Sequence, residues 1–248
     1  MRIIARLDVK NEFVIKGIHL EGLRKVGDPN HLAKAYYDAA IDEIIFIDAV
    51  ASLYNRNNLF SIIREASKEV FVPITIGGGI RTIGDIDEAL DSGADKVAIN
   101  TEAVRNPKFI EEAAKRYGSQ CIVASIQAKR IATGWEAYVE TGREKTGLSV
   151  LDWAVCLQNL GAGEILLTSV DKEGTRSGFD MPLIEAVNDL VKIPVVASGG
   201  YGHPKHCNDL LKRTEPSGLC FASVLHYKTT SVGELRKTID QARSKCEI

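Results

Sequence analysis

The chain has 248 residues, of which 45% are hydrophobic and 26% charged, and its formal net charge is −2. This composition is that of an ordinary globular protein, and one domain spanning residues 1–248 is expected. The near-neutral charge gives no electrostatic reason to expect binding to nucleic acid or to an acidic membrane. No apolar run approaches the roughly 20 residues that span a bilayer, and the charged start Met1-Arg2 argues against a signal peptide.

The cysteines indicate a reducing compartment. All five are scattered, with no Cys-x-x-Cys pair: Cys121, Cys156, Cys207, Cys220 and Cys246. Free thiols in the cytoplasm are therefore expected. No set of His, Cys and carboxylate residues has metal-ligand spacing, and neither a metal nor a cofactor is expected.

Short runs rich in isoleucine and valine alternate along the chain with longer amphipathic stretches. The runs predict eight strands, at residues 3–8, 43–48, 74–76, 96–100, 121–127, 164–169, 195–198 and 219–223. The stretches predict eight helices, at residues 29–40, 59–68, 83–92, 108–117, 150–160, 181–191, 205–212 and 231–245. Alternation of strand and helix indicates a parallel sheet covered by helices. Eight units in about 250 residues favour a closed (β/α)8 TIM barrel over an open, doubly wound sheet.

The second half of the chain echoes the first. The segment 72–79 (VPITIGGG) corresponds to 193–200 (IPVVASGG), and 42–45 (DEII) corresponds to 163–166 (GEIL). Such self-similarity predicts an internal (βα)4 twofold repeat, with two equivalent half-sites facing each other across the barrel.

Glycine-rich segments follow two matched strands of this repeat. One is Gly77-Gly78-Gly79 and the other Gly199-Gly200, and the neighbouring strands end at Asn100-Thr101 and Ala222-Ser223. Glycines let backbone N–H groups approach an anion closely. Each cluster alone could be a tight turn, but two at matched positions favour two phosphate sites and a ligand with a phosphate at each end.

Asp8 and Gln127 end the first and fifth predicted strands, where barrel enzymes place their chemistry. The runs Leu7-Asp8-Val9-Lys10 and Ile126-Gln127-Ala128-Lys129 align in the repeat. Asp8 is therefore a candidate general acid or base, although it could instead be a structural residue that bonds loop amides. Gln127 can position or hydrogen-bond a ligand but cannot usefully exchange a proton.

Four charged residues stand near the starts of strands, on the opposite face: Arg2, Glu43, Lys96 and Glu164. Two cations and two anions could close a salt-bridged layer across the barrel floor. Spacing alone favours a structural plug, because stability rather than chemistry is expected at that face.

Taken together, these residues resemble the cyclase subunit of imidazole glycerol phosphate synthase, the HisF family, over essentially the whole chain. Its specific stretches include 7–10 (LDVK), 14–17 (VIKG), 77–80 (GGGI), 93–97 (GADKV), 161–169 (GAGEILLTS) and 197–200 (ASGG). The sister isomerase barrel of the histidine pathway matches less well at 161–169 and at the charged floor.

The resemblance implies a glutaminase partner of the HisH type on the N-terminal face, which Asp95 would contact. Ammonia would pass a gate formed by Arg2, Glu43, Lys96 and Glu164, and this reading replaces the inert plug. Asp8 and Lys16 would be catalytic, with Gln127 at the position of the family's second catalytic aspartate. The resemblance also implies binding of a bis-phosphorylated substrate by Gly79, Asn100, Thr101, Gly174, Gly199, Gly200 and Ser223.

The departures from the family pattern raise alternatives. Gln127 replaces the second aspartate, Arg6 replaces a cysteine, and Glu173-Gly174-Thr175 replaces Asp-Gly-Thr. The parent synthase reaction is one hypothesis. A second is ammonia delivery to a third, sugar-amidating protein that converts acetamido to acetamidino sugars for surface polysaccharides. A third is a non-catalytic activator of the glutaminase.

Overall fold

The computed structural model describes residues 1–51 and 59–244. Eight parallel strands close into a ring, because β12 pairs with β1 and β10 pairs with β7. Around the ring they are β1 (Arg2–Lys10), β4 (Glu43–Asp48), β5 (Ile74–Gly77), β6 (Lys96–Ile99), β7 (Ile122–Ile131), β10 (Glu164–Ser169), β11 (Val195–Ser198) and β12 (Gly218–Phe221). The predicted TIM barrel is confirmed, and β4, β10 and β11 have the predicted bounds.

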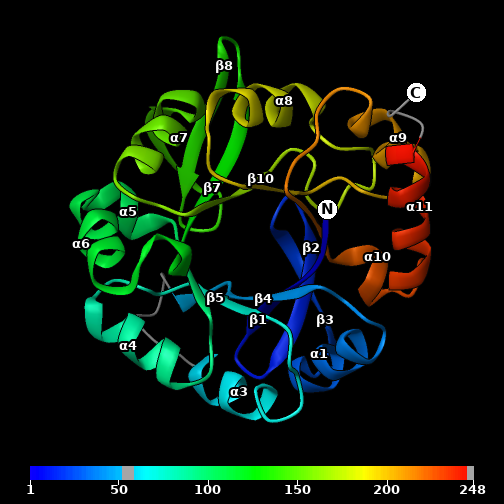
Figure 1. Ribbon diagram of the computed structural model, residues 1–248, viewed down its shortest axis with the longest axis horizontal. Helices are drawn as coiled ribbons and strands as arrows, with labels where there is room; N and C mark the ends of the chain where they lie inside the picture. Colours follow the sequence, from blue (N-terminus) through cyan, green and yellow to red (C-terminus); the bar gives the residue numbers. More distant parts are fainter. Residues whose placement is uncertain (52–58, 245–248) are drawn as a thin grey trace.

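Helices surround the barrel on all sides (Figure 1). The eight predicted helices correspond to α1 (Pro29–Asp38), α3 (Leu59–Ala66), α4 (Ile83–Asp91), α6 (Lys108–Tyr117), α7 (Val150–Asn159), α8 (Met181–Leu190), α9 (Pro204–Leu211) and α11 (Val232–Ser244). Residue 245, the end of the last predicted helix, lies outside the described residues. Two short helices, α5 (Thr101–Arg105) and α10 (Ser223–His226), and a 3-10 turn, η1 (Ser119–Cys121), were not predicted.

Local signals explain where several of these helices begin. Asp28 accepts a hydrogen bond from the His31 N–H at the start of α1, and Pro29 occupies the first turn. Thr82 and Asp85 cap each other's backbone at the start of α4, which is a capping box. These caps hold the helices at fixed positions directly after the barrel loops, so the loops that follow the strands are anchored at both ends.

Two hairpins extend the sheet beyond the barrel, and the sequence reading missed both. β2 (Phe13–Ile18) and β3 (Glu21–Gly27) continue from β1, while β8 (Gly134–Val139) and β9 (Glu144–Ser149) continue from β7. The β7–β8 ribbon projects beyond the helices at the top of Figure 1. The internal twofold repeat itself stays a prediction from the sequence.

The core has two parts. A large apolar cluster lies between the strands and the helices. A smaller one fills the barrel lumen with one side chain from each of seven strands: Ile4, Ile45, Ala98, Val123, Leu166, Val196 and Cys220. Strands buried on both faces explain the continuous apolar runs in the sequence. The lumen cluster separates the floor of the barrel from its mouth, where the polar residues lie. Within the described part of the chain, the structure has no helix able to cross a membrane.

Candidate active site at the mouth of the barrel

A cavity opens at the C-terminal ends of the strands and has a volume of about 930 Å³, including its open mouth. It is lined by the predicted catalytic residues Asp8, Lys16 and Gln127 and by Gly79, Asn100 and Thr101 of the predicted first phosphate site. The structure therefore brings these six residues, from four strands and a hairpin, to one place. The location agrees with the position of active sites in barrels of this kind.

Asp8 is held in a buried ion pair. The Arg6 Nε donates to Asp8 Oδ1 at 2.8 Å, and Arg6 Nη1 donates to Thr168 Oγ1 at 3.0 Å across the barrel. The Lys16 Nζ lies 3.8 Å from Asp8 Oδ2. Burial opposes ionisation of Asp8, but the charges of Arg6 and Lys16 outweigh it and hold the pKa of the carboxyl below its ordinary value. Asp8 is thus a carboxylate at neutral pH, suited to accept a proton rather than to donate one.

Lys16 has a second anionic partner in Glu173, which follows β10. Both side chains are buried. Burial lowers the pKa of the Lys16 ammonium to about 8, against the raising effect of Asp8. An ammonium group with a pKa near neutrality can give up a proton and take it back, so Lys16 can serve as an acid beside the Asp8 base.

The β2–β3 hairpin, which carries Lys16, is docked onto the segment after β10. The His19 N–H donates to the Glu173 carbonyl at 2.8 Å, and His19 Nδ1 lies 3.0 Å from the Val170 carbonyl oxygen. Gly174 packs directly against the Gly17 backbone, where a side chain could not fit. The hairpin therefore covers one side of the mouth in this structure.

Two side chains of the first predicted phosphate site already have hydrogen-bond partners within the protein. The Asn100 side-chain amide donates to the carbonyls of Ser125 and Tyr138, at 2.9 and 3.2 Å, so it is already engaged. Thr101 Oγ1 accepts the Glu140 N–H at 3.3 Å. Gly79, Asn100 and Thr101 line the cavity, and their role in phosphate binding stays a prediction.

Two arginines on the same wall were not predicted from the sequence. Arg81 and Arg105 both line the cavity. Arg81 Nη2 donates to the Ala51 carbonyl at 2.6 Å, and Arg105 Nη2 pairs with Glu140 at 2.9 Å. Their charges favour an anionic group in this half of the mouth. The Gly-Ile-Arg sequence that ends in Arg81 follows a strand directly, and that position could have suggested its role.

The second predicted phosphate site forms a separate, smaller cavity of about 300 Å³. Gly174, Gly199, Gly200 and Ser223 line it, as the sequence predicts, together with Glu173. Gly200 has φ of +103°, and a side chain there would collide with the Gly178 carbonyl. Only glycine tolerates this backbone. The two halves of the mouth thus differ in size, in contrast to the two equivalent half-sites expected from the repeat, because the Lys16–Glu173 pair stands between them.

The four floor residues form a closed ring of ion pairs at the opposite end of the lumen. Arg2 contacts Glu43 at 2.7 Å and also contacts Glu164. Lys96 Nζ lies 3.0 Å from Glu43 Oε1 and 2.9 Å from Glu164 Oε2. Each cation therefore bridges both anions. Thr75, which the sequence reading did not select, donates to Glu43 at 3.0 Å and fixes its orientation.

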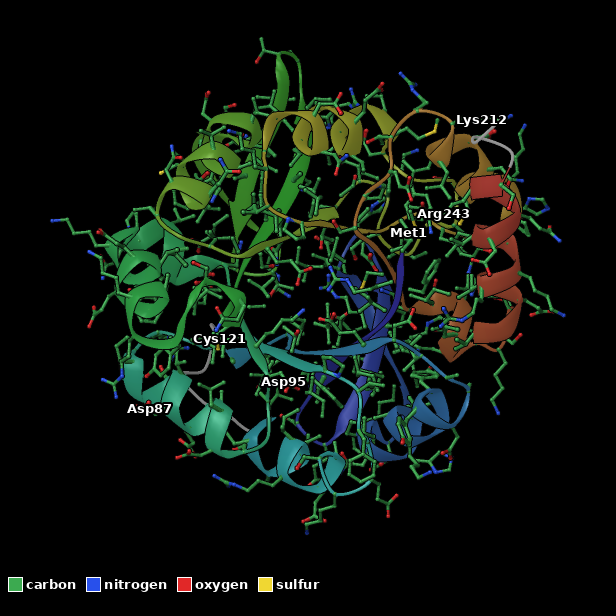
Figure 2. All side chains as sticks on the ribbon, viewed as in Figure 1. Met1, Asp87, Asp95, Cys121, Lys212 and Arg243 are labelled. Atoms are coloured by element: carbon green, nitrogen blue, oxygen red, sulfur yellow. The ribbon has the colours of Figure 1, made fainter. Side chains whose placement is uncertain are left out.

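Asp95, the predicted contact to a partner, lies on the same face as the floor ring. Its Oδ2 accepts the Ile74 N–H at 2.8 Å, at the start of β5. Figure 2 shows Asp95 and Met1 near the centre of the ring of helices and Asp87 on its periphery. One carboxylate oxygen of Asp95 thus stabilises the strand start, and its role toward a partner stays a prediction.

The four cysteines in the described part of the chain are free thiols. Across residues 1–51 and 59–244, no group of three or more His, Cys, Asp or Glu side chains is arranged to hold a metal ion.

A closed barrel whose mouth holds a buried carboxylate and ammonium beside glycine-rich loops has the architecture of a (β/α)8-barrel enzyme. Comparison with known proteins gives the family. A family model described as histidine biosynthesis protein matches residues 2–231. The imidazole glycerol phosphate synthase subunit HisF of Legionella pneumophila is 56% identical over 209 residues, which cover 84% of this chain and 99% of that protein. Subunits of the same name from Streptococcus sanguinis and Bacillus cereus are 45% and 44% identical over 248 residues, the whole of this chain and 98% of each relative. The chain belongs to the histidine biosynthesis protein family, and its relatives are HisF subunits.

Proposed function

We propose that this chain is the cyclase subunit of an imidazole glycerol phosphate synthase. It receives ammonia from a glutaminase of the HisH type at the N-terminal face and uses it at the mouth on a bis-phosphorylated formimino nucleotide. The products are imidazole glycerol phosphate and an aminoimidazole carboxamide nucleotide. The full-length similarity to HisF subunits supports this, and the free thiols fit a cytoplasmic location.

The floor ring is the observation that carries the proposal. Arg2, Glu43, Lys96 and Glu164 close the lower end of an apolar lumen whose upper end adjoins the mouth cavity. A barrel whose reactants all enter at the mouth needs no such ring of two cations and two anions. A barrel that admits a small neutral molecule at its N-terminal face needs a closure that can open. A ring of ion pairs can open because its charges can exchange partners.

In this proposal Asp8 and Lys16 perform the proton transfers. The family uses a second aspartate where this chain has Gln127, which cannot take over that function. Asp8 is ionised and Lys16 has a pKa of about 8, so the two form a base and an acid 3.8 Å apart. The anion-binding loops at Gly79 and Gly200 would hold the two phosphates.

The test is ammonia-dependent turnover of the formimino nucleotide by the purified chain, with Asp8→Asn and Gln127→Asp beside it. Turnover by the native chain that Asp8→Asn reduces at least a hundredfold supports the proposal. No turnover by the native chain overturns it. Turnover by Gln127→Asp alone would show a site of this family adapted to another substrate.

A second function, ammonia delivery to a sugar-amidating protein, is favoured by one feature of the site. Arg6 neutralises Asp8, and Gln127 cannot replace it as a proton-transfer group. A chain that only delivers ammonia would tolerate both changes. Growth of a histidine auxotroph lacking its cyclase subunit, with this gene supplied, would exclude delivery as the sole function. A non-catalytic activator of the glutaminase would keep full product formation by the complex in Asp8→Asn.

A further inference from the structure

The 930 Å³ mouth cavity reaches down to the lumen on one side, whereas the smaller cavity meets the lumen cluster at Cys220. Its lining includes Ala98, which belongs to the apolar lumen cluster, and Ile47, which packs against that cluster. Gln127 and Ser125 of β7 line the same side. A small molecule that rises through the lumen from the floor ring would therefore enter the cavity beside β7.

Gln127 has an unused hydrogen-bond acceptor at this entry point. Its side chain is only 9% exposed, and its Oε1 atom has no hydrogen-bond partner among the described residues. A buried acceptor without a partner costs free energy comparable to a lost hydrogen bond, so such atoms mark places where a ligand or water completes the site. The missing partner must be a donor, because a carbonyl oxygen only accepts.

The charges around Gln127 select a neutral donor. In the register of β7 and β10, Gln127 lies opposite Thr168, which accepts a hydrogen bond from the buried Arg6 guanidinium. That guanidinium is paired with the Asp8 carboxylate, so the two charges largely cancel and neither favours a cation such as ammonium beside Gln127. The amide of Gln127 accepts an N–H without a negative charge that would favour the ammonium ion.

We propose that Gln127 Oε1 is the receiving site for ammonia where the lumen opens into the mouth cavity. One ammonia N–H donates to Oε1, while the nitrogen lone pair stays free because the neutral amide, unlike a carboxylate, does not favour the ammonium ion. Gln127 then binds the nitrogen source. Because its side chain is an amide and not a carboxylate, it cannot exchange a proton with the bound ammonia. This inference rests on the proposed use of ammonia by the chain.

The experiment is steady-state turnover of the formimino nucleotide with ammonium chloride as nitrogen source, at fixed pH and ionic strength. Native chain, Gln127→Leu and Gln127→Glu are compared, with Gln241→Leu on the exposed face of α11 as the matched control. We expect Gln127→Leu to raise the KM for ammonia about three- to tenfold, the effect of one hydrogen bond, and to change the KM for the nucleotide less than twofold. Gln127→Glu keeps an acceptor oxygen and should stay within about threefold of the native KM for ammonia above pH 8, where free ammonia is more abundant.

Each result separates the receiving site from the proposed function. Turnover by the native chain with an unchanged KM for ammonia in Gln127→Leu overturns the receiving site and leaves the function standing. A raised KM for the nucleotide instead of ammonia makes Gln127 a substrate contact and also overturns it. If the native chain forms no product with ammonia, the function and the receiving site fall together. Circular dichroism and the melting temperature of Gln127→Leu show whether the variant is folded.

Discussion

The Arg6–Asp8 pair gives the sharpest quantitative prediction. Both groups are buried, at 4% and 6% exposure, and they share a 2.8 Å charge-assisted hydrogen bond. Arg6→Met removes the cation but keeps much of the side-chain volume. Loss of one member of a buried pair leaves an uncompensated charge and typically costs about 3–5 kcal/mol. Lys16 stays within 3.8 Å of Asp8, so we expect the lower end, about 3 kcal/mol.

A double-mutant cycle isolates the pair. Asp8→Asn alone should cost a similar amount, because it leaves Arg6 buried with Thr168 as its remaining partner. In Arg6→Met/Asp8→Asn neither charge remains, so the double variant should be more stable than the sum of the single effects predicts, by about 2 kcal/mol. The free energy of unfolding is measured by guanidinium chloride denaturation, with the slope m compared among all four proteins.

Two outcomes would refute this reasoning. A cost below about 1 kcal/mol for Arg6→Met would show that Asp8 does not depend on the guanidinium. Single effects that add within about 0.5 kcal/mol would show that the two charges are independent.

The pH dependence of the free energy of unfolding supplies a further check with a definite sign. The pKa of Asp8 is lowered in the folded state, so its contribution to stability is present above its ordinary pKa and is lost as pH falls through the lowered one. Arg6→Met should therefore make the free energy of unfolding depend less strongly on pH at the acid end.

Three other predictions follow from buried contacts. Burial and the charge of Lys16 lower the pKa of His226 from 6.5 to about 4. The free energy of unfolding should therefore fall by roughly 3 kcal/mol between pH 6.5 and 4. His226→Asn should remove this fall from the profile of melting temperature against pH. Glu173→Gln should raise amide hydrogen exchange in the β2–β3 hairpin, whereas Glu185→Gln, which breaks the exposed pair with Arg213, should not. Gly200→Ala should lower the free energy of unfolding by about 2 kcal/mol in chemical denaturation, since its φ of +103° excludes a side chain.

The barrel could be predicted from the sequence because its strands are buried on both faces and therefore read as continuous apolar runs. The runs at β4, β10 and β11 even gave the correct bounds. The β2–β3 and β8–β9 hairpins gave no such run, because they are partly exposed and mix charged with apolar residues. Their pairing depends on β1 and β7 continuing beyond the barrel, which no local pattern indicates.

The candidate site was predictable in its members but not in its contacts. Asp8, Lys16 and Gln127 were selected from strand ends and from the family resemblance, and they share one cavity. The partner of Lys16 is Glu173, 157 positions away, and this contact depends on how the hairpin folds back over the barrel. The pairing of Arg6 with Asp8 follows from the inward direction of alternate side chains on β1 and required the structure.

The position of Glu173 limits how a bis-phosphorylated substrate can bind. Under the proposed function such a substrate would span both cavities, and the Lys16–Glu173 pair lies between them. A phosphate in the second cavity would repel the Glu173 carboxylate, which lines that cavity, and compete with it for Lys16. The hairpin is held to the segment after β10 by this pair and by the bonds of His19. Under the proposed function, entry of the second phosphate would therefore require Glu173 to release Lys16, and the same release would free Lys16 for proton transfer beside Asp8.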